Sequence, residues 1–211
     1  MSEIVQSPAP TSHAPARART KAQVAHENNI KFAVWLYLGS EVVIFAILIG
    51  AYAVFRYNNP DIVNEVHANT GVGLVALNTF LLLASSWCMV MGLRSIQMDD
   101  KKGLINWIGA TAVLGSIFIA LQAVEYSALS SEGVLLTPGA EFQNFAAHFY
   151  PPTFFHGLHV LVGVVWALRV IWRARGGHYS ATNYLGVETF GLYWHFVDVV
   201  WIVLFTVIYL W

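Results

Sequence analysis

Hydrophobic residues gather into five long runs along this 211-residue chain, and short polar segments separate the runs. The runs cover residues 32–55, 70–96, 104–129, 150–172 and 187–211, with boundaries read from the hydropathy pattern. A helix needs about 20 apolar residues to cross the hydrocarbon core of a bilayer, so each run is long enough to span it. The pattern predicts an all-α integral membrane bundle of five transmembrane helices within residues 30–211.

The composition agrees with a membrane protein. Charged residues make up 11% of the chain, whereas a soluble domain carries about 25%. The only cysteine, Cys88, excludes an internal disulfide and a metal site built from cysteines. Residues 1–29 are polar and rich in Ala, Pro and Ser, so we expect a disordered cytoplasmic tail there.

Basic residues are divided unevenly between the two ends of the predicted helices. With five spans, every Lys and Arg except Arg56 falls in the N-terminal segment, in the connection after the second run, or around the end of the fourth run. Cytoplasmic connections carry the excess of Lys and Arg in membrane proteins. The sequence therefore predicts a cytoplasmic N-terminus and an external C-terminus.

One carboxylate, Glu41, lies near the middle of the first run, in WLYLGSEVVIF, with no basic residue within a helical turn. An ionisable group at this depth costs a few kcal/mol or more unless it faces protein or water. We expect Glu41 either to carry a proton or to be paired across the bundle. Both a proton-exchanging role and a structural hydrogen bond remain open.

The last run carries Glu188, His195 and Asp198, whose spacing places them on one helical face with Gly191. We expect this face to point into the bundle, with His195 and Asp198 bonded to each other or to a neighbouring helix. At the basic end of the fourth run, three arginines are candidates for lipid-phosphate contacts or are ordinary positive-inside anchors. They are Arg169, Arg173 and Arg175.

The third and fourth runs hold further polar residues in their outer halves. Gln122, Glu125 and Tyr126 form a cluster in the third run. His156 and His159 stand three apart in the fourth. A histidine pair can bind a metal, but a tetrahedral site needs further ligands. We therefore predict hydrogen bonds to Glu125, to backbone or to lipid headgroups, and neither a metal site nor a catalytic residue in this chain.

Small residues recur at helical spacing in two runs, which is typical of close helix packing in lipid. The second run has them at a period of seven, and Asn78 in that seam is expected to hydrogen-bond across an interface. The seam is Gly71, Asn78, Ser85 and Gly92. The third run has a stripe of Gly109, Ala112, Ser116, Ala120 and Ala123, which is also interpreted as packing.

Five motifs in one order resemble subunit III of the haem–copper terminal oxidases, the cytochrome c oxidase subunit 3 family. They are WLYLGSEVVIF at 35–45, LNTFLLLAS at 77–85, LGSIFIALQAVEY at 114–126, FHGLHVLVG at 155–163 and YWHFVDVVW at 193–201. The resemblance covers all five runs and omits only the tail. It implies the short five-helix bacterial form, which lacks the first two helices of the seven-helix form.

The resemblance also implies a function and a setting. The chain would contain no haem or copper of its own, hold phospholipid, and stand beside catalytic subunit I and subunit II in a bacterial plasma membrane, with no role in binding nucleic acid. It would stabilise the catalytic subunit and support proton uptake or oxygen access while O₂ is reduced to water. Glu41 falls on the family's carbodiimide-reactive carboxylate.

Alternatives remain open on the sequence. Within the superfamily, the chain could belong to a quinol oxidase or a nitric oxide reductase, because no feature of its sequence indicates the electron donor of the complex. From another class, a small ion-coupled transporter could use Glu41, His195 and Asp198 as a relay, and a purely structural assembly factor would need none of them.

Overall fold

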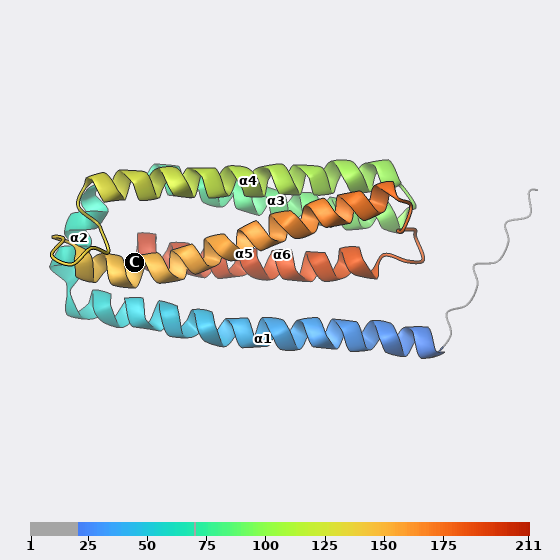
Figure 1. Cartoon of the computed structure of the whole chain (residues 1–211), viewed down its shortest axis with the longest axis horizontal. Coiled ribbons are helices and arrows are strands. Elements are labelled where there is room, and N and C mark those ends of the chain that lie inside the picture. The colour runs from blue at the N-terminus through green and yellow to red at the C-terminus, as the bar shows by residue number, and fades with distance from the viewer. Residues whose placement is uncertain (1–20, 70) are drawn as a thin grey trace, which may run out of the picture.

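The structure, a computed structural model, describes residues 21–69 and 71–211. Within these residues the chain forms six α-helices and a closing π-helical turn, arranged as an elongated bundle (Figure 1). The elements are α1 (Lys21–Asn58), α2 (Pro60–Asn69), α3 (Val72–Gln97), α4 (Lys101–Ser131), α5 (Gln143–Arg175), α6 (Leu185–Phe205) and η1 (Thr206–Leu210).

Five of the described helices are long and apolar enough to cross a membrane, and α6 does so together with η1. The predicted all-α, five-span bundle is therefore confirmed. The short helix α2 was not predicted, because its polar sequence has no apolar run. Pro60 at the first helical position and Asp61 in the first turn both favour the start of this helix.

The N-terminal boundary differs from the predicted one. Helix α1 begins at Lys21, so residues 21–29, which were expected to belong to the disordered tail, are helical. The remainder of the predicted tail, residues 1–20, lies outside the described residues.

The helices alternate in direction, so Lys21 and Trp211 lie at opposite ends of the bundle (Figure 1). We call one end the basic end; there α3 and α5 finish and α4 and α6 begin, with Arg94, Lys101 and Arg175. The opposite end, the acidic end, has α2 and the connection 132–142. An odd number of spans with segregated charge is the arrangement on which the predicted orientation depends.

Two tryptophans of α6 occupy the centre of the bundle. Trp194 fits there because glycines face it: a Cβ at Gly115 of α4 would lie 2.7 Å from its ring, and one at Gly163 of α5 would lie 2.5 Å away. The indole of Trp194 donates to Ser85 Oγ at 3.0 Å. Each buried indole N–H needs such an acceptor, and Trp201 accordingly donates to Thr79 Oγ1 at 2.9 Å.

The seam predicted on α3 is buried from Asn78 onward, whereas Gly71 is exposed. Asn78 Nδ2 donates to the carbonyl oxygen of Phe118 on α4 at 3.2 Å, which confirms a bond across an interface. Gly92 packs against Ile108 of α4.

The stripe predicted on α4 behaves differently. Ala112 is buried, but Ser116, Ala120 and Ala123 are exposed, and a Cβ at Gly109 would meet no atom within 4 Å. Within the described chain only Ala112 of the stripe is buried, so packing at its other positions stays a prediction.

Helix α1 lies along one side of the bundle, against α5 and α6 (Figure 1). Its basic end is held by Lys31, whose Nζ lies 2.7 Å from a carboxylate oxygen of Glu188. Towards the acidic end, the hydroxyl of Tyr52 donates to the carbonyl oxygen of Ile208 at 3.3 Å. Between these two contacts lies the site described next.

Candidate functional site

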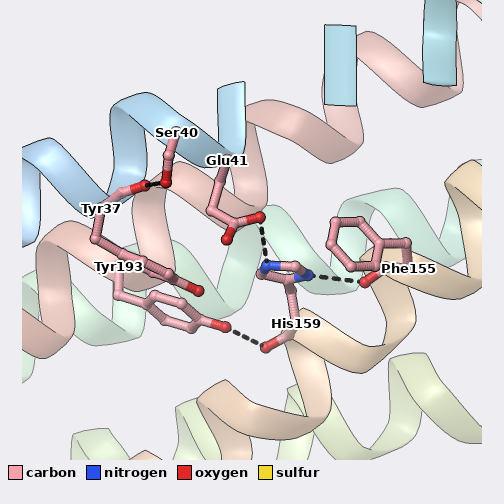
Figure 2. Close-up of polar contacts among 6 residues, drawn as sticks. All are labelled: Tyr37, Ser40, Glu41, Phe155, His159 and Tyr193. Carbon is pink, nitrogen blue, oxygen red and sulfur yellow. Dashed lines mark hydrogen bonds and ion pairs between the residues drawn. The ribbon is translucent and has the colours of Figure 1, made fainter. Parts of the chain in front are cut away.

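Glu41 of α1 and His159 of α5 point toward one another across the helix interface (Figure 2). Oε2 of Glu41 lies 3.3 Å from Nε2 of His159. The two residues are 8% and 7% exposed. The sequence predicted that Glu41 is either protonated or paired across the bundle. In the structure its partner across the bundle is His159.

The contact of the second ring nitrogen, Nδ1, defines the tautomer of the His159 imidazole. Nδ1 of His159 lies 2.8 Å from the carbonyl oxygen of Phe155, and a carbonyl can only accept, so Nδ1 carries a hydrogen. In a neutral ring Nε2 is then a bare acceptor that faces a carboxyl oxygen. A hydrogen bond between these two atoms would need a proton on one of them, and at 3.3 Å the carboxyl oxygen and Nε2 are in contact without meeting the geometry of a hydrogen bond.

Aromatic rings surround this pair. The rings of Phe45 and Phe155 lie 5.3 and 4.7 Å from the imidazole, centroid to centroid. The hydroxyl of Tyr193 donates to the carbonyl oxygen of His159 at 2.9 Å, which fixes α6 against α5 at this depth (Figure 2). These contacts hold the imidazole in place at the interface of α1, α5 and α6.

His156, three residues earlier, faces a different part of the bundle. It is fully buried, its ring lies 4.9 Å from Trp201 and 5.6 Å from Phe118, and neither ring nitrogen has a hydrogen-bond partner. The two histidines thus do not converge on a shared ligand. No group of three or more His, Cys, Asp or Glu side chains placed to hold a metal occurs among residues 21–69 and 71–211.

The polar cluster of α4 bonds to α5. Gln122 Nε2 donates to the carbonyl oxygen of Thr153 at 3.0 Å and to the hydroxyl of Tyr126 at 3.1 Å. That hydroxyl donates to Thr153 Oγ1 at 2.8 Å. Glu125 was one of three kinds of partner predicted for the histidines, and it lies instead beside the hydroxyl of Tyr209 in η1. His159 has the predicted backbone partner, the carbonyl oxygen of Phe155.

The polar residues of α6 separate into two places. His195 Nδ1 lies 2.6 Å from Ser86 Oγ on α3, and Asp198 is also within hydrogen-bonding reach of Ser86. This matches the expected bridge to a neighbouring helix. Glu188 does not join them, because it pairs with Lys31 of α1.

Of the three candidate lipid contacts, Arg173 is engaged within the chain. Its guanidinium lies 5.8 Å from the ring centroid of Tyr179, in the connection between α5 and α6. Burial raises the pKa of the Tyr179 hydroxyl, and Arg173 and Arg169 act in the opposite direction. Arg169 and Arg175 have exposed side chains.

Sequence reasoning did not find the partners Lys31, Ser86, Thr153 and Tyr209. Each belongs to a common residue type with no local signature, and only the tertiary packing brings it to the predicted group. Of these four partners, Ser86 was the easiest to predict from the sequence, because it is next to Ser85 of the predicted α3 seam.

Comparison with known proteins places this arrangement in a family. The family model for cytochrome c oxidase subunit III matches residues 16–211. Cytochrome c oxidase subunit 3 of Synechocystis sp. is 42% identical over 186 residues, covering 88% of this chain and 77% of the relative. That of Thermostichus vulcanus is 39% identical, covering 83% and 84%. Subunit 3 of the cytochrome bo(3) ubiquinol oxidase of Pseudomonas aeruginosa is 32% identical, covering 88% of each chain. This chain belongs to the cytochrome c oxidase subunit III family.

Proposed function

We propose that this chain is the non-redox subunit III of a haem–copper respiratory oxidase of the cytochrome c oxidase type. The family match over residues 16–211 carries the proposal. The chain would span a bacterial plasma membrane five times, with its N-terminus in the cytoplasm, beside catalytic subunit I and subunit II. Membrane phospholipids would cover its outer faces.

Neither His156 nor His159 is arranged to bind haem or copper. His156 is enclosed by aromatic rings, and His159 is committed to Glu41 and to a backbone carbonyl. We therefore place both cofactors in the partner subunits and route no electron transfer through this chain. Its contribution is to stabilise the catalytic subunit and to hold a proton at the Glu41–His159 pair, where it would support proton uptake.

A quinol oxidase is the second candidate for the complex. The relative from Pseudomonas aeruginosa is named as a subunit of a ubiquinol oxidase and is covered over 88% of its length. The electron donor binds elsewhere in the complex, so the two candidates predict the same structure for this chain.

Purification of a tagged full-length chain from its own membranes tests this function. We expect it to bring down haem-containing subunits, visible in a reduced-minus-oxidised absorbance spectrum, together with O₂ consumption. Turnover with reduced cytochrome c or with quinol then identifies the donor. A haem-free chain that moves ions in liposomes would contradict the proposal and favour a transporter.

Replacing Glu41 with Gln is expected to leave haem content and initial O₂ turnover largely intact, because no electron passes through this chain. An amide can still hydrogen-bond to Nε2 of His159, so the helix contact survives. Haem absorbance and O₂ uptake of the purified complex measure the two quantities. Complete loss of turnover in a fully assembled E41Q complex would show that the carboxyl takes part in the reaction itself.

A further inference from the structure

One ring nitrogen of His195 reaches the surface of the bundle at mid-membrane depth. His195 on α6 and Ser86 on α3 each lie within about 4 Å of the midpoint of their spans. Nδ1 of His195 lies 2.6 Å from Ser86 Oγ. Nε2 has no hydrogen bond to a residue within 21–69 and 71–211, and the bundle does not enclose it as it encloses both ring nitrogens of His156. The imidazole therefore has one bonding position open to the outside of the chain.

Asp198 adds an unsatisfied carboxyl group one turn beyond His195. The residue is 6% exposed and lies beside Ser86, and its Oδ1 has no hydrogen-bond partner among the described residues. No Lys or Arg occurs within two turns of it along α6. The contact between α3 and α6 thus holds more polar groups at this depth than the described part of the chain satisfies.

Apolar side chains surround the open nitrogen. Residues three, four and seven positions from His195 or Ser86 share the same helical faces, and four of them are between 41% and 57% exposed. They are Leu83 and Val90 of α3 and Val199 and Ile202 of α6. Such a surface can face either lipid or another helix, and the polar group at its centre decides between the two.

Lipid chains cannot satisfy this polar group. Acyl chains carry no hydrogen-bonding atoms, so a polar side chain that faces them in the bilayer core is strongly disfavoured. A transmembrane helix satisfies its own backbone groups internally, so only its side chains can bond to Nε2. Nε2 of a neutral ring accepts if Nδ1 carries the hydrogen, and it donates in the other tautomer. Hydroxyl and carboxamide side chains both donate and accept, so they match either tautomer.

We propose that the α3–α6 face centred on His195 is an interface with another subunit, whose transmembrane helix places a hydroxyl or carboxamide side chain against Nε2. The inference rests on the proposed function only for the identity of that subunit, a member of the oxidase complex. It gives His195 two bonds, one to Ser86 inside the chain and one across the interface. The four apolar side chains around it pack against the same partner helix.

Photocrosslinking in the intact complex tests the interface. The photoactivatable residue p-benzoylphenylalanine replaces Val199 in one sample and Val165, which is 60% exposed on α5, in a control. After illumination of isolated membranes, mass spectrometry identifies the protein joined to the tagged chain. We expect position 199 to join a different subunit of the complex at several times the yield of position 165. Equal yields, no adduct from position 199, or an adduct with a second copy of this chain would overturn the proposal.

Two replacements of His195 separate its two bonds. In His195→Asn the carboxamide takes the place of Nδ1 and keeps the bond to Ser86, whereas in His195→Gln it reaches the place of Nε2. An interhelical hydrogen bond in a membrane contributes about 1 kcal/mol, which is about fivefold in affinity. We therefore expect the complex of the Asn variant to dissociate about fivefold more readily on dilution in detergent, and that of the Gln variant to resemble the unchanged complex.

Thermal unfolding of the tagged full chain in the same detergent controls for folding. The Asn variant keeps the internal bond, so its thermal midpoint should stay the same while its complex weakens. An Asn complex as tight as the unchanged one, or equal weakening in the Asn and Gln variants, would contradict the bond across the interface. Haem absorbance of the purified complex reports separately on the proposed function, because a haem-free complex joined through position 199 would support the interface and exclude the oxidase.

Discussion

Replacing Gly115 with leucine is expected to destabilise the folded chain by about 3 kcal/mol or more and to prevent its assembly into the complex. A Cβ at this position would lie 2.7 Å from Trp194 Cη2 and 3.1 Å from Val164 Cγ2, so even a methyl group has no room. Trp194 cannot withdraw freely, since its indole donates to Ser85 on α3. Thermal unfolding of the full chain in detergent and the haem recovered with a tagged copy measure the two effects.

Two other glycines provide matched controls. Gly109→Leu lies on the same helix but meets no atom within 4 Å, so it should leave the thermal midpoint unchanged. Gly92→Leu should have an intermediate effect, because its first contact, at 2.8 Å, is the flexible end of Ile108. Equal stability of the Gly115 and Gly109 variants would refute the packing described around Trp194.

Removing one partner of the Glu41–His159 pair is expected to destabilise the chain by about 1–3 kcal/mol, because a buried polar group then loses its partner. His159→Leu and Glu41→Leu should each show this loss. The double variant should lose less than the sum of the two, with a coupling of about 0.5–3 kcal/mol. Unfolding of the four proteins of this cycle in the same detergent gives the coupling.

A control for this cycle combines Glu41→Leu with His195→Leu. His195 bonds to Ser86 on another face of the bundle, so these two changes should add without coupling. Additive losses for Glu41 and His159 themselves would mean that the 3.3 Å contact contributes nothing, and the proton-holding pair would have to be abandoned.

The five spans could be predicted because length and hydropathy are local properties of the sequence. The choice of partners could not be predicted, since helical periodicity gives the face on which a residue lies and not the helix that covers it. His156 and His159 illustrate this limit: three residues turn a helix by about 300°, and the remaining 60° separates a ring packed on Trp201 from one that meets Glu41.

Glu188 illustrates a second limit. Its spacing from His195 predicted a shared inward face, but it lies in the first turn of α6, where Lys31 of α1 is within reach. Helix α2 illustrates a third, because a polar helix outside the membrane leaves no hydrophobic pattern. The functional roles of Glu41, His195, Asp198 and the arginines stay predictions until the variants are measured.

Two indole hydrogen bonds set the register between α3 and α6. Trp194 meets Ser85 and Trp201 meets Thr79, so the two antiparallel helices are fastened at two levels about 10 Å apart along the axis. A translation of α6 by one turn along the bundle axis would break both hydrogen bonds at once. The two hydrogen bonds therefore keep α3 and α6 in one register along the bundle axis.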